Sequence, residues 1–315
     1  MKTTFKTLAM ATLMAGTTLS PAYAKEVTIG VTMSAFDDNF RTLLRRGVER
    51  YADDVGVKLQ VEDAKNELGL QLNQIQNFIA SGVDAIIVNA VDSNATMGIT
   101  DEAQAAGIPL VYLNMEPINL QLLPDNQAYV GSIEAEAGKL QAEEVCRQLN
   151  GQGNAVIIMG DLVHFAALER TRIVHEVFDS NPNCQGMKIV EEQSGKWMRT
   201  EASDLVTNWI SAGIDFDAVI TNNDEMAIGA IQAMDAVGRD MKDVVVAGID
   251  ATADAIQAME VGELDVTVYQ DAFSQGKGAV DTALALIDKK NVPNAVWVPF
   301  KLVTPQNLDE FKGKN

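Results

Sequence analysis

The stretch SGVDAIIVNA, residues 81–90, contains two structural signals within ten residues. Ser81-Gly82 is typical of the end of a helix, because glycine adopts at little cost the left-handed backbone that closes a helix. Residues 85–89, AIIVN, then form a short apolar run, the pattern of a strand that is buried on both faces of a sheet. A helix that ends just before a buried strand is one half of a repeating α/β unit.

The same unit recurs along the chain. AGIP, residues 106–109, again places a glycine and then a proline before an apolar run. The strand candidates are 27–33, 57–61, 85–89, 110–114, 155–159, 187–191, 218–221, 244–249, 266–269 and 296–303. Segments with apolar residues at helical spacing lie between them. Strands that alternate with helices predict an α/β protein with parallel sheets covered on both faces, here in both halves of the chain with a seam near Gly131.

Composition limits the possible partners. The chain has 315 residues, enough for two domains of ordinary size, and 47% of them are hydrophobic. Its formal charge of −20 at pH 7 argues against nucleic acid or an anionic membrane surface as a partner, because both repel an acidic protein. We therefore expect a soluble globular protein.

The first 24 residues have the pattern of a secretory signal peptide. Lys2 and Lys6 form a positive start, residues 8–16 form an apolar run too short to span a bilayer, and AYA, residues 22–24, fits the cleavage rule. We expect cleavage after Ala24 and export, to the periplasm where the host has an outer membrane.

Export makes the two cysteines informative, because disulfides persist in oxidising compartments. Cys146 falls late in a predicted helix and Cys184 in a loop, and each precedes a predicted strand. Both should therefore lie at the same end of one sheet. A disulfide between them and two unpaired thiols both remain open.

Polar and aromatic residues follow the predicted strands. In VTMSAFDDNF, residues 31–40, a strand end is followed by two carboxylates and an amide between two phenylalanines. The other segments in this position are 114–116, 161–165, 196–197, 222–223, 250 and 270, and they too contain amides, carboxylates and aromatic rings. Ligands of open parallel sheets bind beyond the carboxyl ends of the strands. The set fits a neutral polyhydroxylated molecule, because such groups pair with adjacent hydroxyls while rings cover the apolar face.

Six motifs together resemble a known family. They are SAFDDNF (34–40), SGVDAIIVNAVDSNAT (81–96), AGIPLVYLN (106–114), TNNDEMAIGAIQAM (221–234), VVVAGIDATADA (244–255) and DVTVYQ (265–270). The chain from about residue 27 to 304 resembles the periplasmic substrate-binding proteins of sugar ABC importers, of the ribose-binding type. Within that family it looks most like the branch for inositol and inosamine-type rhizopines.

The resemblance implies the type I periplasmic binding protein fold, with two similar lobes, each a parallel sheet flanked by helices. The first lobe would comprise residues 25–131 and 271–299, and the second residues 132–270 and 300–315. Three hinge crossings would join them near 131–132, 270–271 and 299–300. The family implies a monomer that closes around its ligand and then docks on a permease driven by an ATPase, both separate chains.

The resemblance also implies the ligand-binding residues. Carried over, they are Ser34, Asp38, Phe40 and Asn114 in the first lobe, and Trp197, Asn223, Asp250 and Gln270 in the second lobe and hinge. Phe40 and Trp197 should lie on opposite faces of the ligand's ring. Asn223 could instead serve only as a helix cap, although Asn222 beside it could take that role.

The sequence departs from the ribose-type pattern at three positions. Asn114-Met115 stands where the family has Asp-Arg, Leu168 where it has a second arginine, and Arg41 where it has a second aromatic. The pocket should thus lose two guanidinium groups while it keeps Asp38 and Asp250, and unpaired carboxylates are costly in a dry cleft. Two readings stay open. In the first, the ligand carries an amine, as an aminocyclitol does, or is less polar than a pentose. In the second, Arg41 turns inward and the ligand is a neutral cyclitol such as myo-inositol.

Other functions find less support in the sequence. The chain has only two histidines, His164 and His175, and no nucleotide-binding or catalytic motif at the required spacing, so we expect neither an enzyme nor a cofactor. His164 follows a predicted strand and could reach the cleft. A repressor with the same two-lobed core would need a basic headpiece where the signal peptide stands. A pentose, hexose or sugar alcohol as ligand, and an additional chemoreceptor role, remain alternatives.

Overall fold

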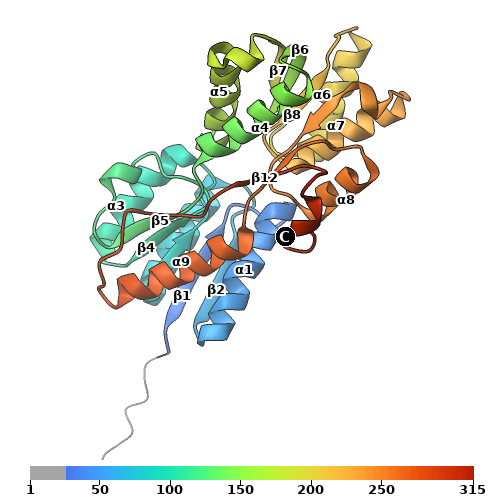
Figure 1. The fold of residues 1–315 in the computed structure, drawn as a ribbon. Helices are drawn as coiled ribbons and strands as arrows, with labels where there is room; N and C mark the ends of the chain where they lie inside the picture. Colours follow the sequence, from blue (N-terminus) through green and yellow to red (C-terminus); the bar gives the residue numbers. More distant parts are fainter. Residues whose placement is uncertain (1–25) are drawn as a thin grey trace, which may run out of the picture.

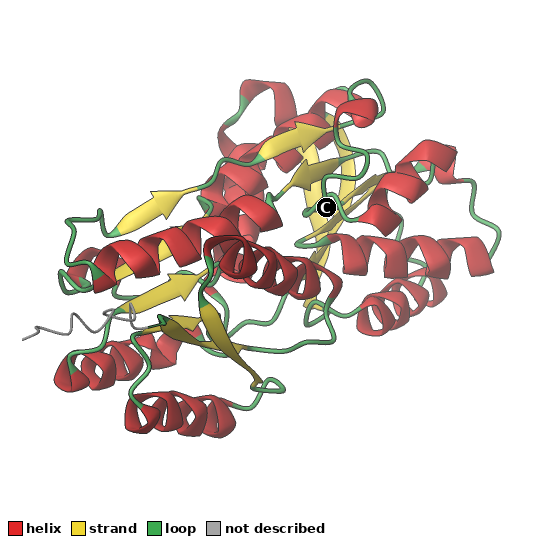
Figure 2. Cartoon of the chain, turned by 90° about the horizontal axis from the view of Figure 1, so that it is seen from below, coloured by secondary structure: helices red, strands yellow, loops and turns green. Residues whose placement is uncertain are grey.

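The computed structural model describes residues 26–315, which form two lobes of similar construction (Figure 1). The predicted signal peptide and its cleavage site lie outside the described residues. Within residues 26–315, no helix combines the length and the apolar character needed to cross a membrane. In each lobe helices cover both faces of a sheet (Figure 2).

The first lobe contains a six-stranded parallel sheet in the order β11-β5-β4-β3-β1-β2. Its strands are β1 (Thr28–Met33), β2 (Lys58–Asp63), β3 (Ala85–Val88), β4 (Leu110–Leu113), β5 (Gln127–Gly131) and β11 (Ala295–Trp297). Helices α1 (Asn39–Val55) and α9 (Ala272–Ile287) pack on one face of the sheet, and α2 (Leu68–Ser81) and α3 (Thr96–Ala106) on the other.

The second lobe contains a four-stranded parallel sheet in the order β7-β6-β8-β9. Its strands are β6 (Gln152–Met159), β7 (Gly186–Ser194), β8 (Ala218–Thr221) and β9 (Val245–Ala247). Helices α4 (Glu134–Gln148) and α5 (Phe165–Ser180) cover one face, and α6 (Arg199–Ser211), α7 (Asp224–Ala236) and α8 (Ala253–Val261) the other. A separate antiparallel pair joins β10 (Thr267–Tyr269) to β12 (Lys301–Val303).

The local signals act as the sequence predicts. Gly82 and Gly107 close α2 and α3 with left-handed φ angles of 71° and 69°. The short apolar strands β3, AIIV, and β8, AVIT, are buried along their whole length because helices cover both faces. In these two units a glycine therefore closes the helix just before the next strand, β3 and β4.

Two sequence predictions about strands are wrong. The segment 296–303 does not form one strand: it divides into β11 and β12, which belong to different sheets. Pro299 lies between them and has no backbone N–H for a ladder, so it ends the first strand. The second error is β5, which the sequence did not reveal because the strand is only five residues long and begins with the polar residue Gln127. This side chain is buried and donates from Nε2 to the Thr100 carbonyl at 2.8 Å.

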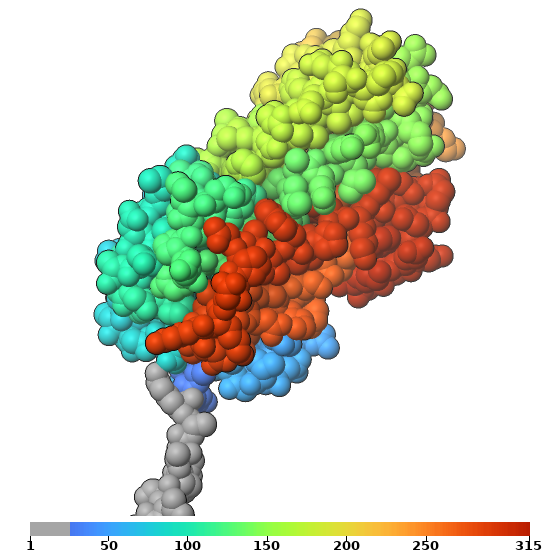
Figure 3. Space-filling model, turned by 60° about the vertical axis from the view of Figure 1, so that its left-hand side comes forward, coloured from blue at the N-terminus to red at the C-terminus, as the bar shows by residue number. Residues whose placement is uncertain are grey.

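The chain crosses between the lobes three times. The crossings run from β5 to α4, from β10 to α9 and from β11 to β12. Figure 3 shows the last part of the chain running along one face of the molecule from the first lobe to the second. Two lobes connected only by short crossings can change their relative orientation without disturbing either sheet.

Cys146 of α4 and Cys184 of the short helix Pro182–Cys184 form a disulfide in the structure, with their Cα atoms 5.4 Å apart. Both residues are buried beside the parallel pair β6–β7, at the end of the sheet where these strands begin. The bond closes a segment with a sequence separation of 38 residues.

Removing this bond should destabilise the protein. Closure of a loop of this length restricts the unfolded chain, and the chain-entropy model gives about 4 kcal/mol. We expect Cys146→Ser with Cys184→Ser to lower the free energy of unfolding in urea by about 2–4 kcal/mol. Thiol titration of the unfolded protein should find no free thiol before reduction and two after it. Two free thiols without reductant would contradict the bond.

Candidate functional site

A cavity lies between the two lobes, where the strands of both sheets end. It contains about 390 Å³ of space not filled by atoms, part of which is continuous with the solvent. The first lobe contributes Asp38, Phe40, Arg41, Asn114 and Met115 to its lining. The second lobe and the crossing after β10 contribute Glu134, Ala166, Arg170, Trp197, Asn223, Asp250 and Gln270. Because the lining comes from both lobes, a small molecule held there would contact both of them.

Of the predicted site residues, only Ser34 lies outside this lining. Ser34 is fully buried, and its hydroxyl donates to Asn89 Oδ1 at 2.6 Å. Asn89 in turn donates to the Leu113 carbonyl at 3.1 Å. Ser34 therefore helps to tie together the ends of β1, β3 and β4, and its hydroxyl is already occupied.

In the first lobe, the start of α1 positions three of the lining residues. Asp38 caps the helix: its Oδ1 accepts a hydrogen bond of 2.7 Å from the Arg41 backbone N–H. Burial raises the pKa of Asp38, and the guanidinium of Arg41 opposes this shift. Arg41 itself is buried and donates from Nη1 to Asn66 Oδ1 at 3.1 Å. Of the two readings left open by the sequence, the structure has Arg41 turned inward.

In the second lobe, an unusual loop presents Trp197. Lys196 and Trp197 both have left-handed φ angles, 53° and 67°, which non-glycine residues rarely adopt. The ring packs directly over Gly160, where an added Cβ would lie only 2.1 Å from Trp197 Cζ2. Glycine at position 160 therefore lets the indole lie flat against the loop after β6. Its Nε1 donates to His164 Nδ1 at 2.7 Å.

Asn223 has two structural partners. It caps α7, because its Oδ1 accepts from the Met226 backbone N–H at 3.0 Å. Its Nδ2 donates to the Trp197 carbonyl at 3.3 Å. Asn222 does not replace it as the cap, since Asn222 Oδ1 accepts from Gly160 N–H at 2.9 Å. Asn223 therefore caps the helix and also lines the cavity.

Asp250 is buried in the loop after β9, three residues beyond the strand, with a φ angle of 126°. Among residues 26–315, no group donates a hydrogen bond to its carboxylate at normal geometry. Burial raises the pKa of Asp250 well above its ordinary value, and the nearby carboxylate of Asp224 raises it further, whereas Arg170 opposes the shift. The carboxylate is thus an unused acceptor in the cavity wall.

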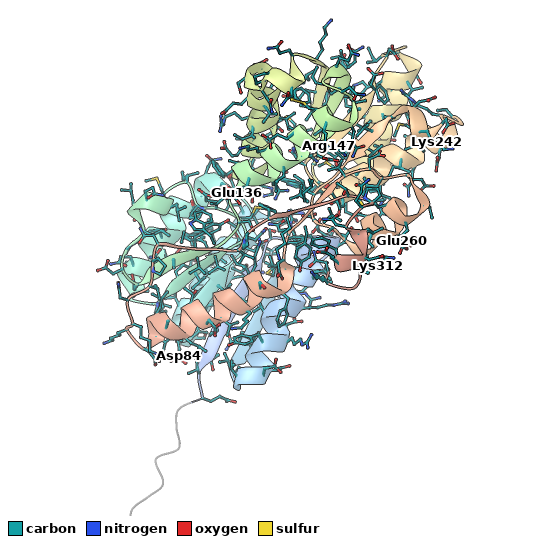
Figure 4. The ribbon with its side chains drawn as sticks, viewed as in Figure 1. Asp84, Glu136, Arg147, Lys242, Glu260 and Lys312 are labelled. Atoms are coloured by element: carbon teal, nitrogen blue, oxygen red, sulfur yellow. A yellow bond between two sulfur atoms is a disulfide. The ribbon has the colours of Figure 1, made fainter. Side chains whose placement is uncertain are left out.

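Gln270 lies beside Asp250 and is 1% exposed. Its Nε2 is buried without a hydrogen-bond partner among the described residues. The backbone of both residues is fixed by Asn315, whose Nδ2 donates to the carbonyls of Asp250 at 2.7 Å and Gln270 at 2.8 Å. Lys312, which pairs with Glu260 at 2.7 Å, holds this last segment on the second lobe (Figure 4). The cavity therefore presents a free donor next to a free acceptor.

Arg170 and Glu134 line the cavity although the sequence analysis did not place them there. Arg170 donates from Nε to Glu134 Oε2 and from Nη1 to the Asn222 carbonyl, both at 2.6 Å. The expected loss of two guanidinium groups is therefore wrong, since Arg41 and Arg170 supply them. Leu168, the position compared with a family arginine, is 48% exposed and points away. A detectable signal was that Arg170 shares the buried face of α5 with Ala167 at helical spacing.

Two further titratable groups lie near the cavity. Glu116 is half-buried just outside the lining, and burial, aided by Glu134 and Glu169, raises its pKa to about 7. His164 is buried behind Trp197 and does not line the cavity. Neither Glu116 nor His164 is therefore placed to contact a ligand in the cavity directly.

The lining contains more carboxylates than guanidinium groups. Asp38, Glu134 and Asp250 are acidic, whereas Arg41 and Arg170 are basic. Glu134 pairs with Arg170, and Arg41 adjoins Asp38, so the unmatched carboxylate is that of Asp250. Such a site favours a ligand with several hydroxyl groups and tolerates a positive charge near Asp250.

A cavity between two lobes that are joined by three crossings of the chain is typical of proteins that bind a solute by lobe closure. A family model described as periplasmic binding protein domain matches residues 29–291. The chain therefore belongs to the periplasmic binding proteins.

Individual relatives resemble the chain over nearly its whole length. A protein of Rhizobium meliloti named "Putative rhizopine-binding protein" is 54% identical, and the match covers 96% of this chain and 98% of the relative. A solute-binding protein of an ABC transporter from Bacillus halodurans, solved with bound myo-inositol, is 38% identical with a TM-score of 0.86, covering 92% of this chain and 98% of that one. The myo-inositol-binding protein of Caulobacter, also solved with myo-inositol, is 27% identical with a TM-score of 0.85, covering 93% and 98%.

The buried carboxylate of Asp224 should make stability depend on pH. It accepts hydrogen bonds from Thr252 N at 2.8 Å and Thr267 Oγ1 at 2.7 Å, yet burial raises its pKa to about 7. The folded state then binds a proton that the unfolded state has released, so stability falls as pH rises from about 4 to 7. We expect Asp224→Asn to make this fall less steep by about 1 kcal/mol per pH unit.

The measurement is urea unfolding at pH 5, 6 and 7. The control is Asp53→Asn, which changes an exposed carboxylate on α1 and should leave the slope as in the parent protein. Equal slopes in the parent and Asp224→Asn would show that Asp224 is already ionised in the folded protein at pH 5.

Proposed function

We propose that this protein is the periplasmic substrate-binding component of an ABC importer and captures a small polyhydroxylated ring, a cyclitol such as myo-inositol or an aminocyclitol, by lobe closure. The ligand lies between the lobes and is then passed to a separate permease driven by an ATPase. The protein acts as a monomer, is exported by its signal peptide, and performs no reaction on its ligand.

The observation that carries this proposal is the adjacent pair of unused polar groups at the hinge. Gln270 Nε2 is a buried donor without a partner, and the buried residue Asp250 lines the cavity with a carboxylate to which no described residue donates. Leaving such groups unpaired in a closed protein is costly. Neighbouring hydroxyls of one ring can donate to Asp250 and accept from Gln270, so a cyclitol satisfies both.

Aromatic rings supply the second part of the interaction. Phe40 from the first lobe and Trp197 from the second both line the cavity, so closure brings a ring from each side to the ligand. Covering about 100 Å² of ligand carbon contributes roughly 2–3 kcal/mol at 25 cal/mol per Å². The remainder comes from hydrogen bonds of about 1 kcal/mol each, or more where a charge is involved.

The relatives support the ligand class. Two structures similar to this chain hold myo-inositol, and a relative that is 54% identical is named for rhizopine. Other relatives are named for galactose, at 32% identity, and ribose, at 29%. A pentose, hexose or sugar alcohol is therefore the alternative to test beside the cyclitol.

The first prediction for this function concerns Trp197. Isothermal titration at pH 7 should show binding of myo-inositol or an inosamine in preference to ribose, galactose and xylitol. Trp197→Ala should weaken that binding about 30-fold or more, because it removes about 2 kcal/mol of stacking. Trp297→Ala is the matched control: this half-exposed tryptophan packs on Tyr129 away from the cavity and should leave affinity unchanged. Tighter binding of ribose would remove the cyclitol assignment.

The second prediction separates neutral from amine-bearing rings. Because Asp250 is the unmatched carboxylate, an inosamine should bind about tenfold or more tightly than myo-inositol at pH 7, as expected for a charged hydrogen bond. Asp250→Asn should remove most of this difference. Equal affinity of the parent protein for the two rings would contradict a role for the amine and leave a neutral cyclitol as the ligand.

A further inference from the structure

Two short segments join the lobes beside the cavity. Three consecutive residues of the second lobe, 163–165, bond to residues 91–93 of the first. Ser93 N–H donates to the Val163 carbonyl at 3.1 Å, and Phe165 N–H donates to Ser93 Oγ at 3.2 Å. Between them, His164 Nε2 lies 2.9 Å from the Val91 carbonyl. These bonds, here called the cross-lobe contact, require the lobes to be closed.

The two bonds of His164 fix the state of its ring. The indole N–H of Trp197 can only donate, so His164 Nδ1 must be free of a proton to accept it. The Val91 carbonyl can only accept, so Nε2 must carry the hydrogen. Both bonds therefore exist together only in the neutral imidazole with its hydrogen on Nε2.

His164 thereby links the opposite lobe to a ring of the cavity. Trp197 lines the cavity from a loop with a left-handed backbone, whereas His164 lies behind it and does not line the cavity. The bond to Trp197 lies within the second lobe, and the bond to Val91 crosses to the first. The imidazole of His164 thus both orients the indole of Trp197 and bonds to the opposite lobe when the lobes are closed.

We propose that His164 is a positioning residue that couples lobe closure to the orientation of Trp197, against which the ligand ring packs. The proposal rests on the proposed function for the identity of the packed ligand. It adds that protonation of His164 opposes closure, because closure buries the ring against the first lobe and places Arg41 of that lobe near it, and that an imidazolium also loses the bond that orients Trp197.

The charged groups around His164 act in both directions. Arg41 of α1 disfavours its protonation, whereas Asp92 of the first lobe and Asp161 of its own loop favour it. The surface hollow that His164 borders also contains Asp37, Asp38, Lys196, Arg199 and Glu225. Burial dominates and lowers the pKa of His164 to about 4 in the closed form.

Opening the lobes removes part of this burial and separates His164 from Arg41, and both changes raise the pKa of His164 toward its ordinary value of about 6.5. Loss of the Val91 bond acts in the opposite direction but is the smaller effect. At a pH between these two values, closure around a ligand must release a proton from His164. At pH 6 this release approaches about 0.7 proton. Because binding releases this proton, the affinity for the ligand should decrease as pH falls from about 7 to 5.

The experiment compares His164→Gln and His164→Leu with the parent protein, and His175→Gln is the control. Gln can still donate to Val91 and accept from Trp197 but does not titrate, whereas Leu can do neither. His175 is a surface histidine on α5 that contacts Glu192 far from the cross-lobe contact. Titration with myo-inositol at pH 6, in two buffers of different ionisation enthalpy, counts the protons released.

We expect His164→Leu to bind myo-inositol about tenfold or more weakly and His164→Gln to stay within about threefold of the parent protein. On binding myo-inositol at pH 6, the parent protein and His175→Gln should each release about 0.5 proton or more in excess of the number that His164→Gln releases. Carboxylates that titrate during closure are present in all variants and cancel in this comparison. Parent-like affinity in His164→Leu, or equal proton release in His164→Gln, would overturn the proposal.

A second measurement does not need a ligand. In His175→Gln only one histidine remains, so the ¹⁵N spectrum of its ring reports His164 alone. At pH 7 the free protein should show Nε2 protonated and Nδ1 unprotonated, because the Trp197 bond lies within one lobe. The opposite tautomer would overturn the proposal. Failure of the parent protein to bind myo-inositol would count against that ligand only, since the spectrum still decides the role of His164.

Discussion

The buried carboxylate of Asp250, held without a hydrogen-bond donor, is the constraint on which the rest of the site depends. Burying this carboxyl group without a partner costs free energy, whether it stays ionised or takes up a proton as its raised pKa favours, so closure around an empty cavity is opposed. A ligand that donates to Asp250 removes this penalty, which makes ligand and closure favour one another. Several groups with no ligand contact hold the carboxylate in place: Asp224 binds Thr252 beneath it, and Asn315 binds its backbone carbonyl.

The same constraint explains selectivity better than aromatic packing does. Phe40 and Trp197 would cover the face of almost any sugar or cyclitol, so they contribute affinity with little discrimination. A ring whose hydroxyls do not meet Asp250 and Gln270 leaves a buried acceptor and a buried donor unpaired. That mismatch discriminates far more strongly than a missing methylene in an apolar contact. The polar pair at the hinge therefore decides which rings allow the lobes to close.

Much of this site could be predicted from sequence because strand ends follow a geometric rule. Asp38, Asn114 and Asp250 each follow an apolar run, and parallel strands bring their carboxyl ends to one edge. Arg170 and Glu134 could not be found this way, because they lie on helices and their placement depends on how α4 and α5 pack. The fold was predictable for a similar reason: glycine closures and apolar runs are local, whereas the division of 296–303 between two sheets depends on which lobe each half joins.

The two lobes achieve their geometry by different means. In the first lobe, the left-handed positions near the cavity are Asn66, Asn114 and the adjoining Lys65, and the two asparagines tolerate this backbone well. In the second lobe the non-glycine residues with positive φ near the cavity are Lys196, Trp197, Asp250 and Ala251, for which such a backbone is costly by about 1 kcal/mol or more each. Such strain persists only where surrounding bonds fix the loop. The second lobe therefore carries the more finely adjusted part of the site, and its loops hold both the ring and the carboxylate that a ligand must match.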